Sequence, residues 1–105
     1  MNFLLPALVY PLLEELVFRG LIQHTLYQYA WGARRLGTLS VANLITSVLF
    51  GLAHLWRQPL AWAAAVIAPS LLFGYFRDRY HSVVPAIVLH TVYNTGFFWL
   101  FRPGI

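Results

Sequence analysis

The chain contains no cysteine and no lysine, and only three of its 105 residues are acidic. The absence of cysteine excludes a secreted scaffold held by disulfides. Charged residues make up only 10% of the chain, and hydrophobic residues make up 60%, with a mean hydropathy of +0.67. A soluble domain of this length could not bury so much apolar surface. We therefore expect an integral membrane protein whose main surroundings are a lipid bilayer.

All the basic residues are arginines, and the formal net charge is +4. Most of them lie between or after apolar stretches, where membrane proteins keep their cations: Arg34, Arg35, Arg57, Arg77, Arg79 and Arg102. They do not form one basic face, so we expect no nucleic-acid partner. Arg19 is the exception, because it lies inside an apolar stretch.

Four apolar stretches are separated by short connections that contain arginine, glycine or proline. A membrane helix needs about 20 residues, so this length accommodates four. We predict an all-α integral membrane fold, a single domain over residues 1–105 that forms a compact bundle of four antiparallel transmembrane helices. The expected helices cover about residues 3–29, 38–56, 60–76 and 83–101, and Pro69 is expected to kink the third.

The connections after the first and third expected helices carry four arginines, and the opposite side carries two. Cytoplasmic loops are enriched in Lys and Arg. This bias predicts a multi-pass protein with both termini on the non-cytoplasmic side.

Three charged residues interrupt the first apolar stretch: Glu14, Glu15 and Arg19. A charged residue at the centre of a membrane helix costs about 2.5–3.5 kcal/mol on insertion scales, and such residues usually mark function. Glu15 and Arg19 are four residues apart, which favours an ion pair on one helix face. Glu14 points about 100° away from Glu15. We predict that Glu15 is paired and that Glu14 is available for chemistry; a pair that only fixes helix packing is the alternative.

The second apolar stretch carries one polar and small-residue stripe, formed by Asn43, Ser47, Gly51 and His54. Such residues are also common at helix contacts in lipid, so packing alone is an alternative explanation for His54.

On the fourth apolar stretch, His90 and Asn94 lie one helical turn apart. If they converge with the first two groups, the set suits hydrolysis of an acyl bond. A carboxylate can act as general base, while imidazole and amide groups can donate hydrogen bonds to an oxyanion.

Three motifs occur in order on separate apolar stretches. Glu14–Arg19 matches E-E-x-x-x-R, Phe50–His54 matches F-x-x-x-H, and His90–Asn94 matches H-x-x-x-N. Together they resemble the CPBP family of CAAX proteases and bacteriocin-processing enzymes, also called the Abi or type II CAAX prenyl endopeptidase family. The resemblance covers most of the chain.

The resemblance implies an intramembrane endopeptidase, which hydrolyses a peptide bond of a membrane-associated protein or peptide. Glu14 would be the general base that activates water, and His54 would help to position that water. Glu15 would support the site, and Arg19 would hold the glutamates in place.

In the same family pattern, His90 and Asn94 would form the oxyanion hole. The residues expected to line the substrate cavity are Phe18, Phe50, Ser47 and Tyr93. The partner would be a membrane-anchored substrate in a bacterial or archaeal cell membrane. Family members commonly have further helices around this core, which leaves a homo-oligomer, partner helices or a truncated gene open.

A metal is the main open question about the chemistry. Glu14, His54 and His90 could supply three zinc ligands, the number that a catalytic site uses. The chain has no H-E-x-x-H motif, however, and Arg19 beside the carboxylates disfavours a second cation. We therefore expect no cofactor and keep a zinc-dependent variant as the alternative.

Two other classes of function remain open from the sequence. A non-enzymatic bacteriocin-immunity or scaffold protein could bind a peptide in the same cavity, but it would not need the glutamate pair. A small proton-coupled transporter could use the glutamates and histidines as a proton relay.

Overall fold

Helices form most of the protein. The computed structural model describes residues 8–56 and 58–101, with side chains up to residue 96. The first helical segment is continuous and consists of α1 (Tyr10–Glu15), η2 (Leu16–Gln23) and α2 (His24–Tyr27). The later segments are α4 (Val41–His54), the pair α5 (Leu60–Ala65) and α6 (Ile67–Tyr80), and α7 (Val84–Phe101). The mainly helical architecture expected from the sequence is confirmed.

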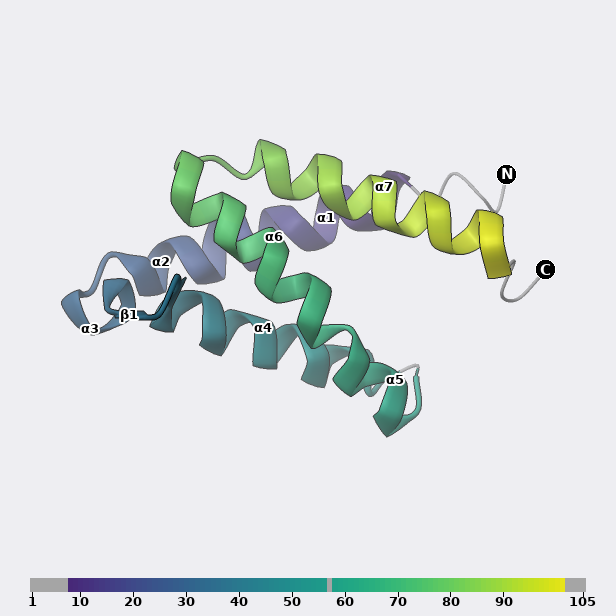
Figure 1. Cartoon of the computed structure of the whole chain (residues 1–105), viewed down its shortest axis with the longest axis horizontal. Coiled ribbons are helices and arrows are strands. Elements are labelled where there is room, and N and C mark those ends of the chain that lie inside the picture. Colours follow the sequence, from purple (N-terminus) through teal and green to yellow (C-terminus); the bar gives the residue numbers. More distant parts are fainter. Residues whose placement is uncertain (1–7, 57, 102–105) are drawn as a thin grey trace.

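Successive helical segments run in opposite directions (Figure 1). Helix α6 crosses the molecule diagonally and contacts α4 on one side and α7 on the other, while α1 packs against α7. The segment η2 contacts both α4 and α6. The three motifs, which lie on the first, second and fourth apolar stretches, are thereby brought around α6.

The third helical segment differs from the expected range of 60–76. It is interrupted at Val66, three residues before Pro69, and it then continues to Tyr80. Proline lacks an N–H group and clashes with the preceding turn, which accounts for a break at this place. Arg77, Asp78 and Arg79 therefore belong to α6, although the sequence suggested a connection there.

Among the described residues, one helical segment is long and apolar enough to cross a membrane, namely Leu60–Tyr80. Helix α4 is apolar but has only 14 residues, a length of about 21 Å. Membrane helices need about 20 residues. The four separate spans expected from the sequence therefore stay a prediction.

The connection between the first and second segments contains a short helix and a hairpin. Helix α3 (Ala30–Ala33) is followed by the strands β1 (Arg35–Leu36) and β2 (Leu39–Ser40), which pair antiparallel. Gly37 provides the positive φ of 69° in the turn, a backbone conformation that glycine adopts without strain. The hairpin ends at Ser40, the N-cap residue of α4. The Ser40 hydroxyl accepts a hydrogen bond from the Asn43 backbone N–H and so caps the helix.

Polar side chains occupy the interior of the bundle and large apolar side chains cover its outside. The buried polar and charged residues are Glu15, Arg19, Gln23, Ser40, Asn43, Thr46, Ser47, Ser70, Asp78 and His90. The apolar core is small by comparison and consists of Ala42, Phe50, Ala63, Phe73 and Ala86. Exposed leucines and valines lie along α1, η2, α4 and α7. A bilayer would cover these apolar faces, which agrees with the membrane environment expected from the composition.

Two glycines allow the helices to approach closely around α6. A Cβ atom on Gly74 would clash with the Asn43 side chain of α4. A Cβ atom on Gly51 would lie only 2.6 Å from the Ile67 side chain. Small residues at such contacts are typical of helix packing in lipid. This close packing places the polar groups of α4 and α6 within hydrogen-bonding distance.

Candidate active site

The buried stripe of the first segment contains Glu15, Arg19 and Gln23, each with no solvent exposure. In a regular α-helix, residues four apart drift by about 40° around the axis. The wider π-helical turns of η2, which begin directly after Glu15, counteract this drift. The three side chains therefore stay on one line that faces the bundle interior.

The two adjacent glutamates have different environments. Glu15 has no exposed surface, and its Oε1 lies 3.4 Å from the Arg19 Nε, so the predicted ion pair is present. The Glu14 side chain keeps 36% of its surface exposed. The pairing of Glu15 leaves Glu14 as the more accessible carboxylate, in agreement with the spacing argument.

His90 lies between the two glutamates. Its Nδ1 is 2.7 Å from the Glu15 Oε2, and its Nε2 is 3.6 Å from the Glu14 Oε1. The ring is stacked on Phe73 at a centroid distance of 5.0 Å, and only 4% of the residue is exposed. Helix α7 thus brings a histidine from the far end of the sequence against both carboxylates.

The guanidinium group of Arg19 is held by α6. Its Nη2 donates to the Ser70 carbonyl at 2.7 Å and to the Ser70 hydroxyl at 2.5 Å. Its Cζ lies 5.2 Å from the centre of the Phe50 ring and 5.9 Å from that of Phe73. The cation is therefore packed between two aromatic faces, which attract it through their negative π surfaces.

Hydrogen bonds continue from Arg19 into α4. The Ser70 hydroxyl donates to the Ser47 hydroxyl at 2.9 Å, and Ser47 donates to the Asn43 Oδ1 at 3.1 Å. The Asn43 amide in turn donates to the Leu71 carbonyl at 2.9 Å. Ser47, expected to line a substrate cavity, is completely buried in this chain of hydrogen bonds. Its position is that of a supporting residue between α4 and α6.

His54 is connected to the site through Phe50. The His54 Nδ1 lies 2.7 Å from the Phe50 carbonyl oxygen, which directs its other ring nitrogen away from its own helix. The Phe50 ring contacts both histidine rings, with centroid distances of 4.6 Å to His54 and 5.7 Å to His90. Phe50 is thus the side chain between the two histidines of the expected catalytic set.

The other expected cavity residues flank this cluster. Phe18 meets Phe50 edge to face at 5.1 Å. Tyr93 contacts Phe73 at 6.2 Å and is 47% exposed. Asn94 follows His90 by one turn of α7 and is partly exposed. All three are more exposed than Phe50, Phe73 and His90 at the centre of the cluster.

A family profile described as Type II CAAX prenyl endopeptidase Rce1-like matches residues 1–96. The chain belongs to this family. The membership confirms the resemblance drawn from the three motifs, and it makes the chain a CAAX-type protease, and thus a hydrolase, of an integral membrane family. Searches of curated proteins and of solved structures found no match.

The Rce1-like chain offers no evident metal centre in the part that the structure describes. Within residues 8–56 and 58–101, no group of three histidine, aspartate or glutamate side chains is placed to hold a metal ion. The zinc ligands considered from the sequence, Glu14, His54 and His90, do not form such a group. The absence of a cofactor expected from the sequence stays a prediction, and no chemical step is assigned to a metal.

Several residues of the site were not anticipated from the sequence. Gln23 donates to the Gly74 carbonyl at 3.0 Å and to the Asp78 carboxylate at 2.9 Å. Ser40 donates to the other oxygen of Asp78 at 2.5 Å. The signal was present for Gln23, which continues the four-residue spacing of Glu15 and Arg19. Ser70 and Asp78 gave no such signal, because their partners lie on other helices.

Proposed function

We propose that the chain hydrolyses a peptide bond of a membrane-associated protein or peptide, with Glu14 as the general base. Glu14 takes a proton from a water molecule, and the resulting hydroxide attacks the carbonyl carbon of the substrate. The proton held by Glu14 then passes to the leaving nitrogen as the C–N bond breaks. This sequence of steps needs no serine or cysteine nucleophile, and the chain has no cysteine.

The different environments of the two glutamates carry this proposal. Glu15 is buried and paired with Arg19 and His90, so its charge is already balanced. Glu14 lies next to the same histidine but keeps more than a third of its side chain exposed. A general base must reach water and substrate, and Glu14 is the carboxylate that meets this need.

His90 is suited to stabilise the oxyanion. Its Nδ1 lies 2.7 Å from the Glu15 Oε2, which fixes the ring with its Nε2 on the Glu14 side. Asn94, one turn further along α7, would supply its amide as the second donor. Donors held in place before the reaction lower the barrier most where charge develops, at the carbonyl oxygen.

His54 would position the attacking water from the other side of Phe50. The hydrogen-bonding distance from its Nδ1 to the Phe50 carbonyl fixes the ring, so that its Nε2 can bind a water or the substrate. Arg19 and Glu15 act as positioning residues in this scheme. Phe18, Phe50 and Tyr93 would line the cavity that receives the substrate.

We infer that the helical segments cross a bilayer, with the substrate as a membrane-anchored peptide that carries a C-terminal tail or a precursor segment. The exposed apolar faces of α1, η2, α4 and α7 support this placement. Leu13 and Tyr93, both about half exposed, lie on the segments that carry the glutamates and His90. A second copy of the chain or partner helices would complete the wall of the cavity there.

The test is a cleavage assay in lipid vesicles with a panel of membrane-anchored peptides. We expect Glu14→Gln to lower cleavage by about 10²–10⁴-fold, the usual contribution of a general base. A zinc chelator should leave the wild type active. Activity lost in chelator but restored by zinc would replace the metal-free mechanism with a metal-dependent one.

Folding must be monitored in the same samples. Glu14→Gln should keep the helical circular dichroism and the thermal midpoint of the wild type, because Glu14 is partly exposed. A folded wild type that cleaves no peptide of a broad panel, but binds one of them, would point to the scaffold function instead.

A further inference from the structure

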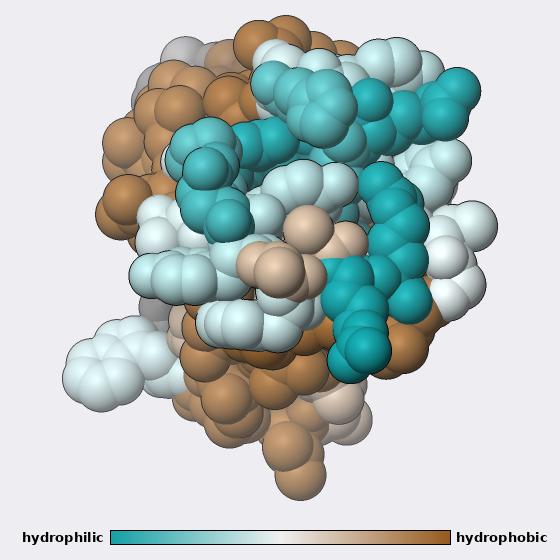
Figure 2. Space-filling model, turned by 90° about the vertical axis from the view of Figure 1, so that its left-hand side faces the viewer, coloured by the Kyte–Doolittle hydropathy of each residue, from teal (hydrophilic) through white to brown (hydrophobic). Residues whose placement is uncertain are grey.

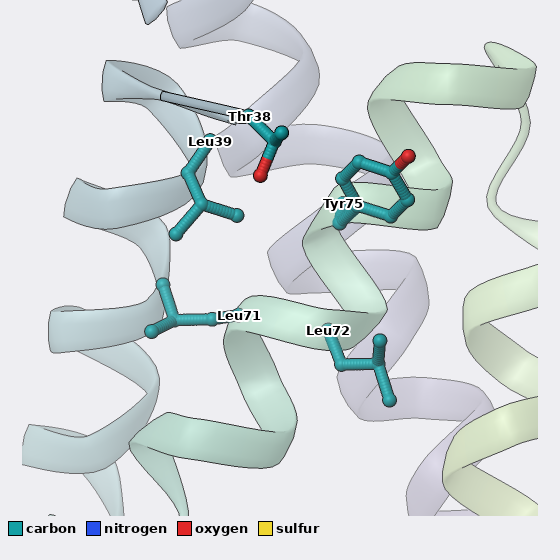
Figure 3. Close-up of a pocket in the computed structure, with 5 residues that line it drawn as sticks. All are labelled: Thr38, Leu39, Leu71, Leu72 and Tyr75. Carbon is teal, nitrogen blue, oxygen red and sulfur yellow. The ribbon is translucent and has the colours of Figure 1, made fainter. Parts of the chain in front are cut away.

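An apolar groove lies between the hairpin and α6, away from the glutamates. It has a volume of about 340 Å³ and is lined by Thr38, Leu39, Leu71, Leu72 and Tyr75. In Figure 3, Thr38 and Tyr75 lie at one end of the groove, and the leucine side chains of α6 lie towards the other. The groove is therefore an open apolar depression with hydroxyl groups at one end.

A polar pocket of about 480 Å³ adjoins this end of the groove and shares Thr38 and Tyr75 with it. Its lining adds charged and hydrogen-bonding side chains from the hairpin, α2 and the end of α6: Tyr27, Arg35, Asp78, Arg79 and His81. Figure 2 looks onto this end of the molecule, where hydrophilic side chains gather between hydrophobic flanks. A charged pocket beside an apolar groove is the arrangement that a lipid headgroup and its acyl chain would need.

The charge that this pocket offers to a ligand is positive. The Asp78 carboxylate is 3% exposed, and its two oxygens accept hydrogen bonds from Gln23 and Ser40. Arg35 and Arg79 are exposed. The Arg35 Nη1 donates to the Thr38 carbonyl at 3.2 Å, and the Arg79 guanidinium lies 5.8 Å from the Tyr80 ring centre. Both cations remain accessible, whereas the acid is enclosed.

We propose that the pocket and the groove together bind one anionic phospholipid. Its phosphate would be held by Arg35 and Arg79, with the Tyr75 hydroxyl beside them, and an acyl chain would follow the groove along Leu39, Leu71 and Leu72. Guanidinium groups bind phosphate oxygens in pairs, and basic pockets between membrane helices recognise anionic headgroups. The adjoining apolar groove favours a lipid over a free phosphate ion, because a free ion would leave the groove empty.

The position of the groove predicts that a bound lipid would stabilise the contact between α4 and α6. The Leu71 carbonyl, at the wall of the groove, accepts the hydrogen bond from Asn43 that joins α6 to α4. A bound lipid would contact both the hairpin that leads into α4 and the face of α6. It would therefore stabilise the contact between these two helices, and a ligand that binds only the folded state raises the thermal midpoint.

The experiment measures the thermal midpoint of the full chain in neutral detergent with added lipid. Phosphatidylglycerol should raise the midpoint in a saturable way, and phosphatidylcholine should raise it less. The double variant Arg35→Gln/Arg79→Gln should lose the preference for phosphatidylglycerol. The matched control is Arg34→Gln, an exposed arginine of the same connection that does not line the pocket, and it should keep the preference.

Two further arms separate the possible ligands. Inorganic phosphate alone should give no comparable shift; an equal shift would overturn the lipid proposal in favour of a simple anion site. Leu72→Trp should fill the groove and weaken the phosphatidylglycerol effect, whereas Leu49→Trp, on an exposed face of α4, should not. Equal effects of the two lipids, or an unchanged effect in the double variant or in Leu72→Trp, would overturn the proposal. Since none of these residues belongs to the catalytic cluster, the result is independent of the cleavage assay.

Discussion

Arg19 donates two hydrogen bonds to Ser70, one to its carbonyl and one to its hydroxyl, across 51 residues of sequence. This contact joins the helix that carries both glutamates to the helix at the centre of the bundle. It also continues through Ser47 and Asn43 into α4. The position of Glu15 therefore depends on side chains of two other helices.

Glu15→Gln should destabilise the protein far more than Glu14→Gln. Removing one partner of a buried ion pair leaves the other charge uncompensated, at a cost of about 3–5 kcal/mol. Glu15 and Arg19 are both fully buried, whereas Glu14 is partly exposed. Thermal unfolding in the same detergent measures the difference. Equal midpoints for the two variants would show that the ion pair does not hold the fold.

Ser70→Ala should lower the free energy of unfolding by about 1–2 kcal/mol, the scale of one interhelical hydrogen bond in a membrane protein. It should also lower kcat while KM stays close to that of the wild type, because Arg19 loses one of its two hydrogen bonds to Ser70 while the substrate cavity keeps its lining. Thr25→Ala, at an exposed position of α2, is the control and should change neither. A rise in KM with unchanged kcat would place Ser70 in substrate binding instead.

Gly74→Ala should disturb the contact between α4 and α6. The added Cβ would clash with the Asn43 side chain, and closely packed interiors tolerate added atoms at a cost of about 1–3 kcal/mol. Gly96→Ala on α7 is the matched control, because nothing lies within 4 Å of its Cβ position. Its helix should become slightly more stable, since alanine is the better helix former. The idea of a tight α4–α6 contact fails if both variants unfold at the wild-type temperature.

Single cysteines can establish the membrane orientation, because the chain has none of its own. Ser82 lies in the connection after α6, and Gln58 lies in the connection after α4. The arginine distribution predicts that Ser82→Cys faces the cytoplasm and Gln58→Cys the opposite side. A membrane-impermeant maleimide added to intact cells should therefore label Gln58→Cys alone. The opposite labelling pattern would invert the topology, and labelling of both would argue against a span between them.

The sequence was sufficient for features that depend on local spacing or on strong composition. The helical architecture follows from long apolar stretches, and the pairing of Glu15 with Arg19 follows from their separation by one turn. The family follows from three short motifs, each contained within one continuous helical segment. The sequence predicts the contact between His90 and both glutamates only if the polar groups of the three helices converge, which the structure shows for these residues.

Other features depend on how helices are placed against one another, which spacing does not reveal. Asp78 falls in the connection expected between residues 76 and 83, yet α6 continues past it, and its carboxylate accepts hydrogen bonds from Gln23 and Ser40. The buried position of Ser47 depends on Ser70 of α6. The π-helical turns of η2 also escaped the sequence reading, because an α-helical period explains Glu15 and Arg19 equally well.

The matched four-residue spacing on two helices has a consequence for assembly. Arg19 and Gln23 on η2 meet Ser70 and Gly74 on α6, each pair separated by the same 51 positions. If either helix slid by one turn, Arg19 would face Gly74 and lose the hydroxyl that it now binds, while Ser70 would face the carboxylate of Glu15. In lipid, apolar contacts between helices have no hydrophobic driving force, so these polar pairs contribute to the alignment of the two helices along their axes. The buried polar residues that make this sequence unusual for a membrane protein therefore also favour one alignment of these two helices.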